Sequence, residues 1–118
     1  MKEKAEIINP GFDIADGEDV RFSFDGDKLR FEFTDWKDQK ITVECQNTIG
    51  FKYQWATGEY LDEERYDSSH IIHHSKWLKQ HTKEGETWEG EQWGHYKLNF
   101  NAAGVMEILC SNIKKSNK

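Results

Sequence analysis

The sequence is short of several residue types, and each shortage excludes a class of protein. Its 118 residues include one proline and two cysteines, and no run of 18 apolar residues, so no transmembrane helix is predicted. The first residues, MKEKAEIINPGF, hold no apolar stretch long enough for a signal peptide. Basic residues are also few, with 16 Lys and Arg against 22 Asp and Glu and a formal net charge of −6. Non-specific binding to nucleic acid or to an anionic membrane is therefore not expected.

Hydrophobic residues are scarce as well, at 36% of the chain, but aromatic residues are not. Phe, Trp and Tyr make up 14% of the residues, whereas disordered chains are poor in aromatic side chains. We therefore expect the chain to fold, and its length predicts a single domain over residues 1–118.

The two cysteines lie 65 positions apart, which fits neither a CxxC motif nor a metal finger. Cys45 and Cys110 each end an alternating apolar run, so we expect two reduced and buried side chains. A disulfide between them is the alternative, and it would need an oxidising compartment. Because no export signal is visible, the predicted location is the cytoplasm.

Apolar and polar residues alternate through much of the chain, which is the pattern of half-buried strands. The dipeptide Asp25-Gly26 between two such runs is a strong hairpin signal. The predicted fold is mainly β: a single antiparallel meander sheet of six to eight strands, strongly curved or split into a sandwich, with short helices at most. The clearest runs cover residues 20–24, 29–33, 41–45, 49–55, 96–100 and 105–110.

The remaining segments are less regular, and each receives a separate prediction. The tail at 114–118 carries three lysines and no apolar residue, so we expect it to fray. The other predictions are a loop at 56–68, an extended segment at 69–74, a short helix or kinked strand at 75–81, and a loop at 82–94 that could include a brief strand at 87–89.

Three histidines lie together in the extended segment, at positions 70, 73 and 74. Zinc needs three or four ligands that converge on one point. On a strand His70 and His74 would share a face and His73 would lie on the other, whereas on a helix all three could share one face. The spacing does not match HExxH. A small metal- or ligand-binding enzyme built on these histidines is therefore an alternative function, while no metal or other cofactor is predicted.

Serine chemistry also has candidates, because three serines lie near the histidines: Ser68, Ser69 and Ser75. None of them is flanked by the glycines of a GxSxG elbow. Carboxylates are numerous, but no pair stands in apolar surroundings that would raise a pKa. The sequence therefore predicts no catalytic residues and no enzyme.

The clearest functional feature is the concentration of acidic residues in segments 59–67 and 84–91, each with a local net charge of −4. Aromatic residues lie among these acids, and Trp88 and Trp93 are assigned to the surface, whereas Trp55 and Trp77 are assigned to the core. Carboxylates would steer a basic partner and exposed rings would anchor it. Alternatively, the acids only keep a sheet protein in solution. The predicted partner-binding residues are Glu59, Asp62, Glu63, Glu64, Asp67, Glu84, Glu86, Trp88, Glu89, Glu91 and Trp93; segment 13–19 adds four further acids.

Three segments carry a family resemblance: Asp35-Trp36 between strands, Ser75-Lys76-Trp77-Leu78, and the closing hairpin at 96–110. In their order along about 90 residues they resemble small acidic bacterial toxin-immunity proteins. The resemblance implies binding and inhibition, with acids presented to the basic cleft of a nuclease toxin. We therefore predict a cytoplasmic inhibitor of a basic protein partner. A self-associating β module, dimerising through a sheet edge, is a further alternative.

Overall fold

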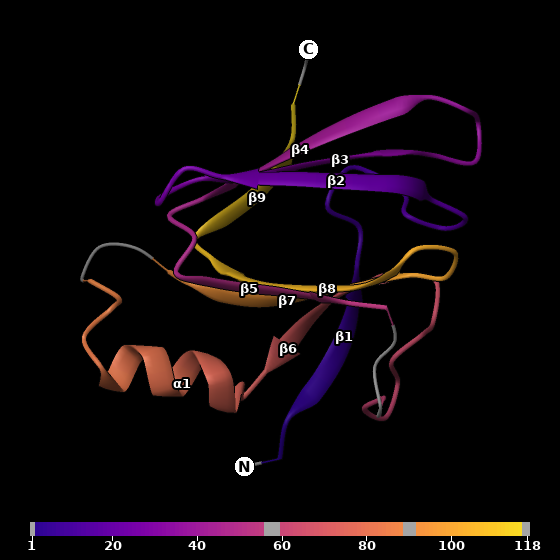
Figure 1. Ribbon diagram of the computed structural model, residues 1–118. Helices are drawn as coiled ribbons and strands as arrows, with labels where there is room; N and C mark the ends of the chain where they lie inside the picture. Colours follow the sequence, from indigo (N-terminus) through magenta and orange to yellow (C-terminus); the bar gives the residue numbers. More distant parts are fainter. Residues whose placement is uncertain (1, 56–59, 89–91, 117–118) are drawn as a thin grey trace.

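The computed structural model describes residues 2–55, 60–88 and 92–116 (Figure 1). All strand pairs in these ranges are antiparallel, and they form a five-stranded sheet of order β1-β6-β7-β8-β5 and a four-stranded sheet of order β2-β3-β4-β9. The mainly β prediction is confirmed, and the two sheets form a sandwich. The elements are β1 (Lys4–Ile8), β2 (Glu18–Phe24), β3 (Leu29–Thr34), β4 (Lys40–Gln46), β5 (Gly50–Gln54), β6 (Ser69–His73), α1 (Lys76–Lys83), β7 (Gly94–Phe100), β8 (Gly104–Cys110) and β9 (Asn112–Lys115).

The hydrophobic core lies between the sheets, which are the upper and lower layers of Figure 1. Alternation along β3 buries Leu29, Phe31 and Phe33 and leaves the side chains between them at least partly exposed. From the other sheet, Phe100 meets Phe31 and Phe33 edge-on, with ring centroids 6.4 and 5.3 Å apart. Aromatic rings are large, so a few of them fill much of the space between two sheets. This packing explains how so polar a chain acquires a core.

Three connections cross between the sheets, and two of them lie side by side: those from β4 to β5 and from β8 to β9. The chain passes from β4 to β5 through Asn47, which has a left-handed φ of 51°, and from β8 to β9 through the single residue Ser111. The Ser111 N–H donates to the Gln46 carbonyl at 2.9 Å, and Asn47 Nδ2 donates to Ser111 Oγ at 2.9 Å. The meander therefore ends at β4, and β5 pairs with β8 in the other sheet.

The predicted fraying of residues 114–118 is wrong for Lys114 and Lys115. These two residues form the end of β9 and pair with Glu44 and Val43 of β4. Backbone hydrogen bonds to β4 and the half-buried Ile113 hold the segment, although its lysine side chains are exposed. Residues 117 and 118 lie outside the described ranges.

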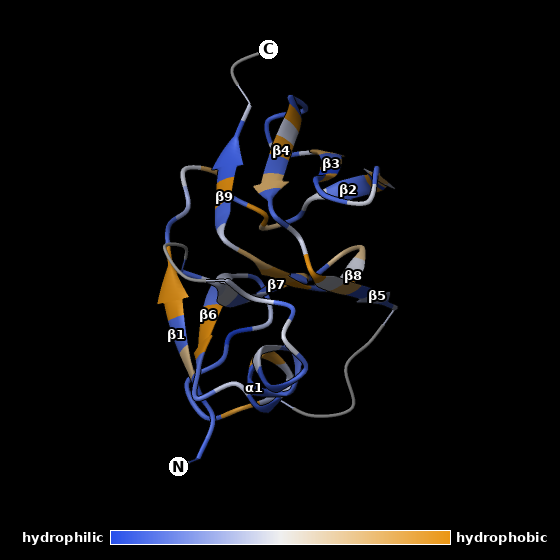
Figure 2. Cartoon of the chain, turned by 90° about the vertical axis from the view of Figure 1, so that its left-hand side faces the viewer, coloured by the Kyte–Doolittle hydropathy of each residue, from blue (hydrophilic) through white to orange (hydrophobic). Residues whose placement is uncertain are grey.

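The outer face of the five-stranded sheet is covered by α1 near one end and by segment 60–68 near the other (Figure 1). Ser75 caps α1 by accepting the Leu78 N–H at 3.0 Å, as serine commonly does at this position. Within the described ranges α1 is the longest helix, and its mostly hydrophilic eight residues are too few to cross a membrane (Figure 2). Beneath the two covers, the polar positions of β7 are buried: His95, Lys97 and Asn99. Buried polar groups need partners, and those partners define the sites described below.

Candidate partner-binding surface

The two predicted acidic loops lie at opposite ends of β7 (Figure 1). Residues 84–88 precede the start of that strand, whereas segment 60–68 is bonded to its end: the Asn99 N–H donates to the Ser68 carbonyl at 3.1 Å. A seven-residue strand is about 20 Å long. The structure therefore separates Asp62, Glu63 and Asp67 from Glu84 and Glu86. The predicted contacts Glu59, Glu89 and Glu91 lie outside the described residues.

Glu64 is a buried anchor of its loop, so its predicted role in contacting a partner is wrong. Its side chain is 0% exposed and lies 2.8 Å from Lys97 Nζ. Its carboxylate also accepts the Leu61 N–H at 2.7 Å and the Asn99 side-chain amide at 2.9 Å. A buried carboxylate is tolerated when a cation and hydrogen-bond donors surround it, as they do here.

His70 holds the same loop through both of its ring nitrogens. Nε2 accepts the Arg65 N–H at 3.0 Å, so Nδ1 carries the hydrogen and donates to the Lys97 carbonyl at 3.3 Å. The side chain is fully buried, and this burial lowers the pKa of the imidazole. Asn99 adds a bond from its side-chain amide to the Arg65 carbonyl at 2.6 Å. Segment 60–68 is thus fixed to the sheet at several points.

The three neighbouring histidines do not converge on one point. His70 is buried with both nitrogens bonded, while His73 is exposed and pairs with Glu6 at 2.7 Å. His74 leaves the strand with a left-handed φ of 60°. Within the described part of the chain, a different trio brings three potential metal-ligand atoms within 4.8 Å of one another: His81, Glu84 and Glu86.

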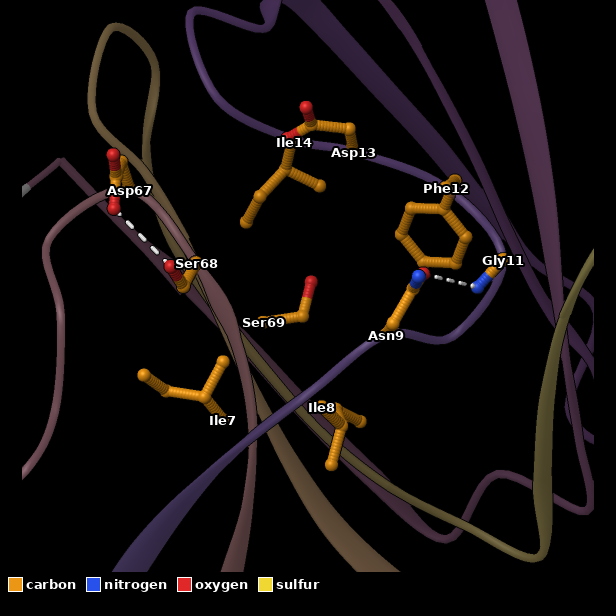
Figure 3. A pocket seen from close by; sticks show the side chains of 10 residues that line it. All are labelled: Ile7, Ile8, Asn9, Gly11, Phe12, Asp13, Ile14, Asp67, Ser68 and Ser69. Atoms are coloured by element: carbon orange, nitrogen blue, oxygen red, sulfur yellow. Dashed lines mark hydrogen bonds between the residues drawn. The ribbon is translucent and has the colours of Figure 1, made fainter.

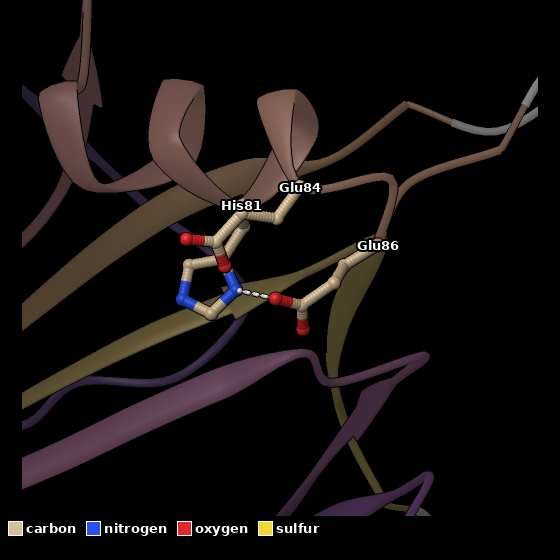
Figure 4. Close-up of side chains that lie close together, drawn as sticks. All are labelled: His81, Glu84 and Glu86. Carbon is tan, nitrogen blue, oxygen red and sulfur yellow. Dashed lines mark hydrogen bonds and ion pairs between the residues drawn. The ribbon is translucent and has the colours of Figure 1, made fainter.

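That trio lies at the end of α1 (Figure 4). His81 Nδ1 is bonded to Glu86 at 3.0 Å, and Gln80 donates to Glu84 at 2.6 Å. Both carboxylates are exposed. Their hydrogen bonds with His81 and Gln80 account for this geometry without an ion. We therefore assign no metal to the trio.

Three large aromatic side chains are exposed near segment 60–68. Trp55 is 79% exposed, Tyr60 51% and Tyr66 66%, and together with the β7–β8 turn they line a cavity of about 300 Å³. The prediction that Trp55 belongs to the core is wrong, because β5 ends at Gln54 and Trp55 extends past the sheet. Asn99 also lines this cavity, and its Oδ1 is buried with no hydrogen-bond partner among the described residues.

Three other tryptophans, Trp77, Trp88 and Trp93, lie toward the opposite end of β7. Trp88 is 52% exposed, in accord with its predicted place on the surface. Its ring meets that of Trp93 at a centroid distance of 4.5 Å. Trp93 is only half-buried, and its Nε1 donates to the Asn47 carbonyl at 3.0 Å. Trp77 is also half-buried, against His95. Residues 87 and 88 form no strand.

The acidic segment at 13–19 joins the 60–68 loop rather than the 84–88 loop. Asp13 and Asp67 line one cavity of about 450 Å³ between the end of β1 and the start of β6 (Figure 3). Asp16 is tied to Asn101 of the β7–β8 turn by two hydrogen bonds of 2.7 and 2.8 Å. We call this part of the molecule the acidic–aromatic end, and it comprises Asp13, Asp16, Trp55, Tyr60, Asp62, Glu63, Tyr66 and Asp67.

No protein-family model, curated protein or solved structure matches this chain. The resemblance to toxin-immunity proteins therefore stays a prediction.

One residue of this surface was missed at the sequence level. Trp55 ends the alternating run 49–55, and the period alone places it with Phe51 and Tyr53 on the core side. The sequence does contain a signal for the exposure of Trp55. This residue directly precedes the predicted loop 56–68, and the last residue of a strand can extend past the sheet into solvent. The acids of 60–67 were recognised, but their composition could not separate the buried Glu64 from the exposed Glu63.

Proposed function

We propose that this protein is a cytoplasmic binding protein that captures and blocks a basic protein partner, as toxin-immunity proteins do. One observation carries the proposal: three exposed aromatic side chains and five carboxylates share the acidic–aromatic end. Exposed Trp and Tyr side chains are the usual anchors of protein interfaces, and surface carboxylates accelerate encounter with a basic partner.

The anchoring of the loop supports this proposal. Glu64, His70 and Asn99 hold segment 60–68 to the sheet, so little conformational entropy would be lost when a partner binds. Asp62 and Glu63 are well exposed, and their ion pairs with lysines are long, at 3.8 and 4.0 Å. Such exposed pairs stabilise a protein by at most about 1 kcal/mol, so basic groups of a partner can replace those lysines.

The proposed mechanism is occlusion of a cationic cleft. Carboxylates spaced over a rigid surface would take the place of nucleic-acid phosphates, and the rings of Trp55, Tyr60 and Tyr66 would fill apolar hollows of the partner.

The test compares charge reversal at the two ends of the molecule. The partner is captured on the wild-type chain from cells that produce it, purified, and used in stopped-flow binding at low salt. Asp62→Lys/Glu63→Lys should slow association at least about tenfold, because electrostatic steering raises association rates by about 10–10³. The control Glu84→Lys/Glu86→Lys changes the net charge equally at the other end and should slow it less than about twofold. Equal slowing by both variants would contradict the placement of the surface.

Inhibition itself needs a separate measurement. Saturating amounts of the protein should abolish the partner's activity and should restore the growth of cells that express the partner. Trp55→Ala should speed dissociation about tenfold or more, as expected for an aromatic anchor. A partner that stays fully active when saturated would refute the inhibitory function while leaving binding intact.

The edge of the four-stranded sheet favours a second candidate, self-association. β2 is an edge strand, and Phe22 and Phe24 are about half exposed, at 46% and 45%. An uncovered edge with apolar side chains can pair with a second copy. A bulge between Glu18 and Arg21 interrupts the edge, which works against pairing. Light scattering over a concentration series decides: a constant monomer mass would exclude this candidate.

A further inference from the structure

A chain of hydrogen bonds links Ser75, His95 and Glu107 beneath α1, away from the acidic–aromatic end. Ser75 Oγ lies 2.7 Å from His95 Nδ1, and His95 Nε2 lies 2.8 Å from Glu107 Oε1. The three residues come from the β6–α1 connection, β7 and β8. Serine, histidine and carboxylate joined in this order are the parts of an activated nucleophile, whatever the fold that holds them.

The direction of each hydrogen bond follows from the chemistry of the groups. Burial raises the pKa of the Glu107 carboxyl, but the hydrogen bond from His95 and the charges of Lys52 and Lys97 outweigh it, so the pKa is lowered on balance. As a carboxylate, Glu107 can only accept, and His95 Nε2 therefore carries the hydrogen. Nδ1 is left as the acceptor for the Ser75 hydroxyl proton, which is the state that a general base requires.

The backbone around Ser75 resembles the strand–turn–helix arrangement of known nucleophiles. β6 ends at His73, His74 takes a left-handed φ of 60°, and α1 begins at Lys76. Such a φ is uncommon for a residue other than glycine. Ser75 thereby lies at the amino end of α1, where the Trp77 N–H has no acceptor among the described residues and could donate to a developing oxyanion.

An open cavity of about 660 Å³ adjoins this serine. Its size is within the roughly 300–1,000 Å³ usual for small-molecule sites. Ser75 and His95 form part of its wall, and Ile72, Leu78 and Trp93 supply apolar surface. The cavity therefore places a nucleophile and its base beside space that suits an apolar group.

We propose that Ser75 is a nucleophile activated by His95, and that the cavity takes a small carboxylic ester with an apolar acyl group. Ser75 Oγ would bond to the carbonyl carbon while its proton passes to His95 Nδ1. The ester C–O bond then breaks, and the alcohol leaves with that proton. Water hydrolyses the resulting acyl-serine by the same route in reverse. Glu107 is a positioning residue, because it acts through His95.

The grouping of Ser75, His95 and Glu107 was not predicted from the sequence, because only histidines close to Ser75 along the chain were considered as its partner. Ser75 was considered with His70 and His74, whereas the residue that bonds it lies 20 positions later on another strand. His95 and Glu107 alternate with apolar residues of two strands, which is also the pattern of a solvent-facing row.

The test is covalent labelling with a fluorophosphonate, a probe whose P–F bond breaks when a serine oxygen attacks phosphorus. Mass spectrometry of the wild-type protein should find one adduct, on Ser75. Ser75→Asn keeps an acceptor for the Leu78 N–H, so the helix cap survives, and it should carry no adduct. His95→Gln should label at least about 100-fold more slowly. The control Ser69→Ala, a buried serine of β6, should label at the wild-type rate.

A second measurement separates chemistry from folding. Glu107→Gln should slow labelling, and Glu107→Asp, which keeps the carboxylate, should recover part of the rate. Thermal melting of each variant reports the structural effect independently. A p-nitrophenyl butyrate assay should give hydrolysis that Ser75→Asn abolishes. Wild-type protein that takes up no more probe than Ser75→Asn while melting cooperatively would overturn the proposal, and Ser75, His95 and Glu107 would then serve only to hold α1.

Discussion

Replacing Lys97 by methionine tests whether the buried ion pair holds the acidic–aromatic end in place. The Lys97 side chain is 7% exposed and that of Glu64 is 0% exposed, so methionine would leave a buried carboxylate without its cation. Removing one member of such a pair costs about 3–5 kcal/mol. Glu64 would keep its bonds to the Leu61 N–H and the Asn99 amide, which favours the lower end, about 3 kcal/mol. That loss is large beside the roughly 5–15 kcal/mol that stabilises a domain.

Urea unfolding followed by tryptophan fluorescence measures this loss. The matched control is Lys40→Met, because Lys40 pairs with Glu32 at 3.2 Å but is 68% exposed, and its loss should cost less than about 1 kcal/mol. The double variant Lys97→Met/Glu64→Gln removes both charges. Its loss of unfolding free energy should be smaller, by at least about 1 kcal/mol, than the summed losses of the single variants Lys97→Met and Glu64→Gln. If Lys97→Met behaved like Lys40→Met, or if the losses were additive, the buried pair would not be the anchor.

Three further predictions concern pH, backbone and thiols. Burial lowers the pKa of His70 below its ordinary 6.5, so the unfolded chain binds a proton first as the pH falls. The free energy of unfolding should therefore decrease between about pH 7 and 5. In urea titrations at several pH values, His70→Gln should reduce this dependence on pH. Gly104→Ala should cost at least about 2 kcal/mol more than Gly26→Ala in thermal melts, because both glycines have positive φ but only at Gly104 would a Cβ lie 2.6 Å from a carbonyl oxygen. A hydrogen bond with Cys110, together with burial, raises the pKa of the Cys45 thiol, so a thiol reagent should label the native protein only as it unfolds, and rapid labelling would contradict the burial of the pair.

The strands that face the core were predictable from the sequence. Alternation at 29–33 and 41–45 placed Phe31, Phe33 and Val43 correctly, because a strand has a period of two wherever one face is buried. The Asp25-Gly26 hairpin was also predictable, since the Asp25 carboxylate accepts two backbone N–H groups of the turn and glycine adopts its φ of 98°.

The pairing of the strands was not predictable in the same way. Alternation fixes the face on which a residue lies but not the sheet to which its strand belongs, so β5 could not be assigned to β8. The strands β1 and β9, with five and four residues, are too short to show a clear alternation. Lys97 and Asn99 had the spacing of solvent-facing residues, and only the cover formed by segment 60–68 buries them.

The candidate sites also contain features that local sequence reveals and features that only the tertiary structure reveals. A cluster of acids with aromatic neighbours is visible in composition, and Asp62 and Glu63 are indeed exposed. The inward turn of Glu64 depends on Lys97, 33 positions later, and the pairing of Ser75 with His95 depends on two elements being packed together. Contacts of this kind are set by tertiary structure, so a local pattern contains no trace of them.

The paired crossings between the sheets have a consequence for the order in which the chain can fold. Strand β4 is made early, but its outer neighbour β9 lies 70 positions later at the Glu44–Lys114 pair, and β1 waits for β6 across 67 positions at Ala5–Ile72. Such distant pairings close slowly, on the order of milliseconds to seconds. Until β9 arrives, β4 presents a bare edge to any neighbouring chain. Once β9 has paired with β4, this edge of the sheet is a strand of four residues that ends in two lysines, and short, charged edge strands resist pairing with another chain.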